Sequence, residues 1–517
     1  MSASGGLQSP EFSRDFSSHI EIPWQFPESN NFEVSASAEL SRPSLPPDHQ
    51  LIELFELFFS HFYPLLPCFH KTTLLGEVKS QEIQKQAPFL VYAIISMSAK
   101  VHPNPTTQAY RDVWFNQAKE LYELTQRDTL PGLRVIQTGI CIAFHASKLG
   151  QYSTAWLSLG KAWRQACALS LNRLDDETGG RFGLGPPPKS SLEREEYRRT
   201  LWSLFILDRS QSWPIGWPHG IDDRQYMVNL PIEERRFQSA ATLTLDDIRS
   251  TPFSRNLSKL IAAPSTQGGS ADLFQYLIKS YVILGRVVEH VHDLHGSPDD
   301  EDYFRESNYL DSQIIRFRLS LPRVATSILA ASADDYLHVA WLNVMLNTIA
   351  ILLHYRATVL KPASLEAEND EENTRFAQCV AAARSTIQFI KDMSRVSLDP
   401  LFNPHIAPDI YLVSCVLIID WRQTGDENVK SDIDMLDLFF DRLYEVYPMV
   451  GKKFKVALRY DLQRDNEGVR KMREAGARGL LADCSTLRRL LKTDEQLQQD
   501  SFPLIPNRGL QVNGQVI

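Results

Sequence analysis

The spacing of apolar residues along the chain predicts an all-α fold. Over most of the sequence, apolar side chains recur every three or four residues, the interval that places them on one face of a helix. Clear examples are residues 51–62, 89–97, 136–144, 156–166 and 436–443. Runs of alternating β-branched and polar residues, typical of half-buried strands, are almost absent. Because no repeat of fixed period is present, we expect an irregular multi-helix domain and not a solenoid.

The first 48 residues interrupt this helical pattern. They hold eleven serines, six prolines and seven acidic residues, against two basic residues. Such a segment buries too little apolar surface to offset the entropy lost on ordering, so we expect a disordered N-terminal tail. Acidic residues alternate there with Ile20, Trp24 and Phe26, a pattern found in activation segments, although an ordinary solvated tail explains the same composition. Order is expected to begin with Asp48 as a helix N-cap.

The charge balance argues against direct binding to nucleic acid. The chain has 54 basic and 63 acidic residues, a formal net charge of −9, whereas contacts to phosphates require a basic surface. Its six cysteines are scattered without metal-ligand spacing, which is typical of reduced thiols inside a cell. The N-terminus lacks the pattern of a signal peptide. The longest uncharged stretch, 339–355, contains Asn343 and Asn347 and indicates a core helix more than a membrane span.

The chain also lacks a convincing catalytic signature. Residues 155–161 read AWLSLGK, which superficially resembles a phosphate-binding loop. Trp156 and Leu157 are too bulky there for backbone amides to surround a phosphate, so a helix is the better interpretation. No GxSxG or HExxH motif is present. We therefore expect no enzymatic activity.

The best metal candidate is the segment HVHDLH at residues 290–295. On a helix, His292 and His295 share a face while His290 points elsewhere, so at most a partial metal site forms. A helix C-terminus explains the segment more simply, since imidazoles favour the negative end of the helix dipole and a glycine and a proline follow. We expect no resident metal or cofactor.

The most informative stretch is residues 197–231, YRRTLWSLFILDRSQSWPIGWPHGIDDRQYMVNLP. Its centre is apolar on almost every side, which predicts a buried helix with Trp202 in the core. Glu195 and Glu196 precede Arg199 at the spacing of helix-surface ion pairs, so the paired arginines are expected where the helix emerges. Prolines then pin the following loop so that the chain returns to the core. Trp217 is expected at the surface of this loop, as a candidate interaction residue.

Three segments, 51–75, 150–173 and 197–231, together resemble the fungal-specific transcription factor domain, the middle homology region of zinc-binuclear-cluster regulators. Members of that family open with an aromatic-rich helix and a turn carrying two prolines and a histidine. A tryptophan-bearing helix follows, and then paired arginines, a Trp-containing helix ending in Asp-Arg, and a Gly-x-Pro loop. The residues of this chain that match the motifs are Pro64, Pro67, His70, Trp156, Arg198, Arg199, Trp202, Asp208, Arg209, Gly216, Pro218 and Asp223. Most of them are expected to be scaffold.

The resemblance implies a division of the chain. The acidic, Ser/Pro-rich tail spans 1–48 and the regulatory domain spans 49–360, with its strongest match over 50–235. A C-terminal helical extension at 361–500 and a short tail at 501–517 follow. The sequence departs from the family pattern where Trp217 replaces the usual arginine. The family's six-cysteine zinc cluster is also not found among these residues.

The function implied is that of a nuclear transcriptional regulator that controls a metabolic or biosynthetic pathway. DNA binding belongs to the family, but the module for it is absent here, so this chain alone is expected to bind no nucleic acid and no membrane. Zinc is expected only if a zinc cluster lies upstream. The partners implied are other transcription factors or the transcription machinery, with a homodimer or heterodimer left open. The alternatives are a helical scaffold at chromatin and a regulatory domain that senses a small-molecule effector.

Overall fold

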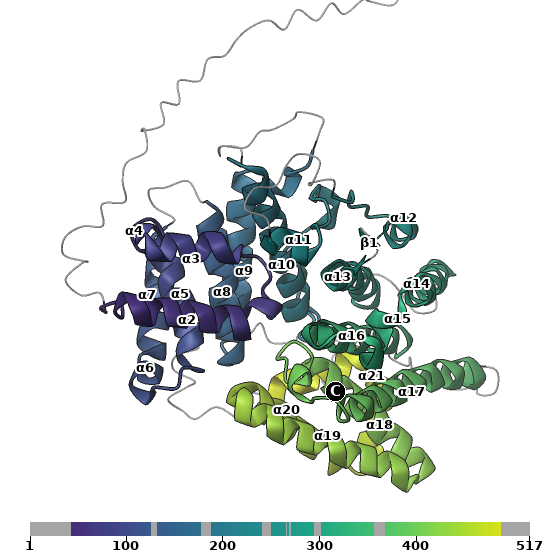
Figure 1. The fold of residues 1–517 in the computed structure, drawn as a ribbon. Coiled ribbons are helices and arrows are strands. Elements are labelled where there is room, and N and C mark those ends of the chain that lie inside the picture. The colour runs from purple at the N-terminus through teal and green to yellow at the C-terminus, as the bar shows by residue number, and fades with distance from the viewer. Residues whose placement is uncertain are drawn as a thin grey trace, which may run out of the picture. The chain divides into compact units, whose positions relative to one another are not determined.

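The computed structural model describes residues 43–125, 132–176, 188–239, 250–293 (except 265, 268 and 269), 301–355 and 368–487. A single compact unit begins at Pro43. The described residues are overwhelmingly helical, so the predicted all-α fold is confirmed (Figure 1). The strands described are two residues long: β1 (Thr266–Gln267) pairs antiparallel with β2 (Ser270–Ala271). Most of the predicted tail lies outside the described residues.

The N-terminal helices pack around α5, in which every residue is buried. They are α2 (Asp48–His61), η1 (Tyr63–Leu65), α3 (Lys71–Lys79), α4 (Glu82–Gln86), α5 (Pro88–Ala99), α6 (Pro105–Ala109), α7 (Arg111–Leu124), α8 (Leu133–Lys148), α9 (Tyr152–Ala168) and η2 (Leu171–Arg173). The phosphate-loop-like stretch 155–161 lies inside α9, so its interpretation as helix is confirmed. Asp48 is not the N-cap of α2 but its first residue. Pro47 takes the cap position, with no side-chain hydrogen bond.

The middle of the chain is built on three long helices, α10, α13 and α16. Its elements are α10 (Ser191–Ser212), η3 (Asp223–Gln225), α11 (Glu234–Ser239), α12 (Leu257–Ala262), α13 (Leu273–Val291), α14 (Glu301–Ser320), α15 (Arg323–Thr326), η5 (Ile328–Ala330), η6 (Ala333–Asp335) and α16 (Tyr336–His354). Ala333–His354 is long and apolar enough to span a membrane, but 72% of its most apolar window is buried inside the protein. It packs as a core helix against α13 and α17.

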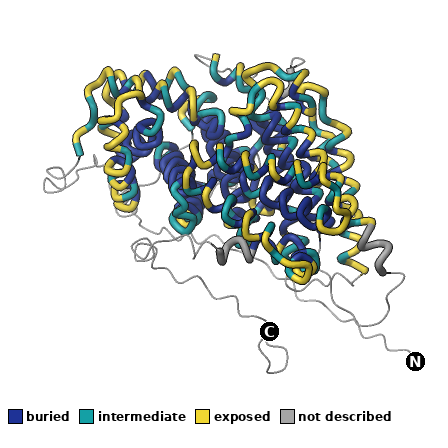
Figure 2. The backbone as a smooth tube through the Cα atoms, turned by 90° about the horizontal axis from the view of Figure 1, so that it is seen from below, coloured by how far each residue is buried: buried dark blue, intermediate teal, exposed yellow. Residues whose placement is uncertain are grey.

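The C-terminal helices surround α18, which is buried along most of its length. They are α17 (Glu368–Met393), η7 (Asp399–Leu401), α18 (Ala407–Thr424), α19 (Glu427–Val446), α20 (Pro448–Leu462) and α21 (Asn466–Leu487). Gly476, with φ of 65°, interrupts the helical geometry of α21. Figure 2 shows the buried residues on the interior helices, while the outer helices carry exposed residues on their outward faces. One hydrophobic core runs through the N-terminal, middle and C-terminal helices.

The histidine segment at the end of α13 behaves as predicted for a helix C-terminus. The helix ends at Val291 and His292 takes the C-cap position. His290 lies 2.7 Å from the Ser307 hydroxyl and stacks on Tyr303. His295 lies outside the described residues. Within the described ranges, no group of three or more His, Cys, Asp or Glu side chains is arranged to hold a metal ion.

Asp409, in the first turn of α18, makes the stability of this core depend on pH. Its side chain is fully buried, and burial raises its pKa to about 7, although an interaction with Thr348 opposes the rise. Between the pKa of an unfolded aspartate, about 4, and this folded value, the folded state retains a proton that the unfolded state has lost. Stability therefore falls as pH rises through this window and levels off above about pH 7.

Asp409→Asn should remove this dependence, because asparagine has similar size and no charge. Between pH 5 and pH 8, the wild type is expected to lose about 2–3 kcal/mol more stability than the variant. Urea unfolding at the two pH values measures the difference. As a control, Asp302→Asn changes a carboxylate that is 88% exposed and should retain the wild-type dependence. If the free energy of unfolding changed equally with pH in Asp409→Asn and in the wild type, Asp409 would not be the group responsible.

Candidate functional site

The N-terminal half of α10 forms a buried ion-pair network. The Ser190 hydroxyl accepts a hydrogen bond from the Glu193 amide and so starts the helix. One turn later, Arg198 donates two hydrogen bonds to Asp175, at 2.8 and 2.6 Å, and pairs with Glu195 at 3.2 Å. The Asp175 carboxylate also accepts the Asn229 amide at 2.9 Å. Although burial opposes the shift, the hydrogen bonds from Arg198 lower the pKa of Asp175.

Arg199 lies deeper still, with an exposed fraction of 0%. Its guanidinium is 3.3 Å from Glu195, pairs with Glu234 and donates to the Ile232 carbonyl at 2.6 Å. The same guanidinium lies over the ring of Phe237, 4.4 Å from its centroid. The prediction that the paired arginines sit where the helix emerges, in surface ion pairs, is therefore wrong. Both side chains are buried. Asp175 and Glu195 supply the partners of Arg198, and the segment after Pro231 supplies those of Arg199.

The far end of the helix holds the loop that follows it. Asp208 accepts hydrogen bonds from the backbone amides of Gly220 and Ile221, at 2.9 and 3.2 Å. Arg209 donates to Asp208 at 2.5 Å and to the Ile221 carbonyl at 2.9 Å. These bonds return the buried Ile221 to the core, as predicted. Gly216 has a φ of 72°, a left-handed conformation that explains the glycine at this position.

Other motif residues join the same scaffold. The carbonyl of Pro64 is 2.8 Å from His338 Nε2, and the carbonyl of Pro67 lies 3.5 Å from Arg199. His70 caps α3 by accepting the Thr73 amide at 3.3 Å, and its ring packs against Phe237. The structure thus brings the first and third sequence motifs together around Arg199.

Two further motif residues, Pro218 and Asp223, lie in the segment that follows α10. Asp223 is buried and accepts a hydrogen bond from Arg255 at 2.6 Å, whereas Pro218 is exposed. The ring of Trp217 lies 4.9 Å from the ring of Trp156, and both side chains are partly buried. Trp217, which is expected at the surface, is only partly exposed, because Trp156 of α9 covers one side of its ring.

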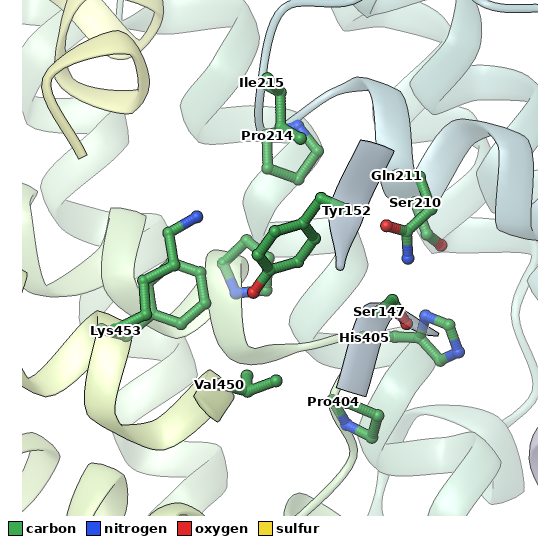
Figure 3. Close-up of a pocket in the computed structure, with 12 residues that line it drawn as sticks. Ser147, Tyr152, Ser210, Gln211, Pro214, Ile215, Pro404, His405, Val450 and Lys453 are labelled. Atoms are coloured by element: carbon green, nitrogen blue, oxygen red, sulfur yellow. The ribbon is translucent and has the colours of Figure 1, made fainter. Parts of the chain in front are cut away.

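A cleft that the sequence analysis missed lies where α20 and the start of α18 meet α8, α9 and α10 (Figure 3). Its lining residues are Ser147, Tyr152, Ser210, Gln211, Pro214, Ile215, Pro404, His405, Pro408, Val450, Lys453 and Phe454. The cavity volume is about 40 Å³, which is room for roughly three water molecules or one group of similar size. None of the twelve lining residues is acidic, and no nucleophile is paired with a base among them. The lining thus combines one lysine and one histidine with mainly apolar side chains.

The chain matches the family of the fungal specific transcription factor domain over residues 55–314. Because this match covers half of the chain, the chain belongs to that family, and the resemblance drawn from the three motifs is confirmed. The family contains transcriptional regulators. Its matched region includes α10 and the ion-pair network around Arg198 and Arg199. No solved structure gives a significant match.

Individual relatives are about a quarter identical to this chain within the aligned segments. A Zn(2)-C6 fungal-type transcription factor, FTF1c of Fusarium oxysporum, is 26% identical over 54% of this chain and 30% of its own length. The citrinin biosynthesis transcriptional activator mrl3 of Monascus ruber is 26% identical over 36% of each chain. The azaphilone cluster-specific transcription factor azaR of Aspergillus niger is 23% identical over 70% of this chain and 77% of its own. The match thus spans about a third of the length of the first two relatives.

Proposed function

We propose that this chain is the regulatory part of a nuclear transcriptional regulator that controls a metabolic or biosynthetic pathway. The observation that carries the proposal is the family match over 55–314, together with the way in which the first and third motifs meet around the buried Arg199. Relatives named as activators of citrinin biosynthesis and of an azaphilone cluster support a pathway-specific role. In this proposal, 49–360 forms the regulatory domain and 361–500 its helical extension.

The chain would act through partner proteins and not by contacting DNA or by catalysis. Its net charge of −9 disfavours phosphate contacts, and its scattered cysteines do not form a zinc cluster. The partners would be other transcription factors, the transcription machinery, or a second copy of the chain. Trp217 is the candidate contact residue, since its ring is held by Trp156 and remains partly accessible. Residues 1–48 would serve as the activation segment.

A tethering experiment tests this function. The chain is fused to a heterologous DNA-binding domain, and reporter transcription is compared for residues 1–517 and 49–517. Transcription should change at least severalfold with the full chain, and removal of the tail should abolish activation. Purified chain without the fusion should show no base-discriminating DNA binding at physiological salt. A silent reporter, or specific DNA binding by the chain alone, would refute the proposal. The alternative of a ligand-sensing domain is favoured by one observation, the cleft between α10 and α20.

A further inference from the structure

Three lysines join the N-terminal and C-terminal helices, and one of them, Lys453, lines the cleft. Lys148, at the end of α8, lies 3.7 Å from the ring centroid of Phe144 and 5.0 Å from that of Tyr447, which follows α19. Lys453 of α20 reaches the other way and lies 4.9 Å from the ring of Tyr152 at the start of α9. Lys100, after α5, donates to the Val446 carbonyl and lies over Tyr447 as well. Lys100 and Lys148 of the N-terminal helices thus lie over the ring of Tyr447. In the opposite direction, Lys453 of α20 lies over the ring of Tyr152.

The positive charges of Lys148 and Lys453 are not balanced by a carboxylate among the described residues. Lys148 and Lys453 are 8% and 9% exposed, and within the described part of the chain neither forms an ion pair or a hydrogen bond with an acidic side chain. Burial lowers the pKa of Lys148 well below its usual value and that of Lys100 to about 8. Aromatic rings compensate the buried Lys453 ammonium only in part, so the cleft beside it favours an added negative charge.

The lining of the cleft fits a ligand that has a negatively charged group and an apolar part. Figure 3 shows Tyr152 between Lys453 on one side and Ser147 and His405 on the other. His405 is 5% exposed, and its Nε2 has no hydrogen-bond partner in the described residues. Its ring is fixed by parallel stacking on Trp341 at 4.9 Å. The remaining lining is mainly aliphatic or aromatic: Pro214, Ile215, Pro404, Pro408, Val450 and Phe454.

We propose that this cleft binds the carboxylate of a small organic acid. Lys453 Nζ supplies the positive charge. His405, on the other side of Tyr152, is neutral because burial lowers its pKa to about 3, so it adds no charge and leaves an Nε2 unpartnered among the described residues at the far end of the cleft. The aliphatic lining contacts the carbon chain, and the bound acid ties α20 to α9 and α10. A carboxylate fits better than a phosphate because the cavity is small and offers few donors. The binding of the acid is inferred independently of the proposed function. Only its role as an effector rests on that function.

Binding is tested on the full chain with sodium butyrate as the probe, by saturation-transfer NMR at constant ionic strength. Butyrate should bind with a Kd of about 1 mM, the range for so small a ligand. Butyramide, of the same shape without charge, should bind at least tenfold more weakly, as should inorganic phosphate. Lys453→Gln should weaken butyrate binding at least tenfold, whereas Lys452→Gln, at the exposed neighbouring position, should leave it unchanged.

The outcomes separate the alternatives. No butyrate binding to the unmodified chain at 20-fold above that Kd would overturn the proposal, whether or not the variants fold. Equal binding of butyramide would overturn the role of the charge, and preferential, Lys453-dependent binding of phosphate would overturn the assignment of a carboxylate. Circular dichroism of both lysine variants shows whether they retain their helices. Because binding is measured without a reporter, its failure is distinct from a silent reporter in the tethering experiment.

Discussion

Replacement of Arg199 by methionine is expected to destabilise the protein by about 3–5 kcal/mol, the range for breaking a buried ion pair from one side. The change leaves the Glu195 carboxylate, which is 0% exposed, without one of its two arginines. It also leaves the Ile232 carbonyl without its 2.6 Å hydrogen bond. Burial already raises the pKa of Glu195, and loss of the guanidinium removes one of the charges that oppose the rise. Urea unfolding at pH 7 measures the loss.

A matched arginine on the same segment serves as the control. Arg224 also pairs with an aspartate, Asp222, but its side chain is 71% exposed. Exposed pairs contribute little because water screens them, so Arg224→Met should leave the unfolding midpoint within experimental error. If Arg199→Met were equally mild, the network at α10 would not be a stabilising unit. Its conformity to the family pattern would then need a functional explanation, such as a partner that contacts the segment after Pro231.

The elements that could be predicted from the sequence are those set by local periodicity. The buried stretch 201–207, the helix across 155–161 and the helix end near His292 all depend on neighbours within one or two turns. In each case the residues that predict the helix or its end lie within the segment itself. The return of Ile221 to the core could also be predicted, because the prolines and glycines before it leave the backbone few alternatives.

The burial of the paired arginines could not be predicted in this way. Arg198 finds Asp175 at a separation of 23 residues, and Arg199 finds Glu234 at a separation of 35. At that distance, helix spacing carries no information, and a charged side chain is by default assigned to the surface. Arg198 is buried against Asp175, and Arg199 is buried because the segment after Pro231 supplies a carboxylate, a carbonyl and an aromatic ring around its guanidinium. Acidic residues that far from the arginines in the sequence do not indicate which arginine they pair with.

The cleft was beyond sequence reasoning for a related reason. Its lining comes from segments between Ser147 and Phe454, and only Tyr152 and residues 210–215 fall within the quoted motifs, neither of which indicates a cleft. Lys453 and Lys148 look like ordinary surface lysines in the sequence, since nothing nearby signals their burial. Only the folded structure shows that both lysines are buried and that neither has a carboxylate partner among the described residues.

Trp202→Ala is expected to cost about 3–5 kcal/mol, the range for truncation of a large aromatic side chain in a core. Trp202 is 0% exposed and packs edge-on against Phe205, Tyr226 and Phe253, with ring centroids 5.2, 4.8 and 5.2 Å away. Its Nε1 donates to the Asn229 carbonyl at 2.8 Å, so truncation also leaves a buried acceptor unpaired. Thermal and urea unfolding of the purified variant measure the cost.

Trp217→Ala is the matched comparison, because it removes the same side chain from the loop that follows the same helix. The contact with Trp156 raises its expected cost to about 1 kcal/mol, above the value for a fully exposed residue but well below that for Trp202. A cost equal to that of Trp202→Ala would show that the loop is an integral part of the core and would remove Trp217 as a candidate contact. A small cost combined with loss of reporter activity at unchanged protein level would instead assign the partly accessible ring to a partner.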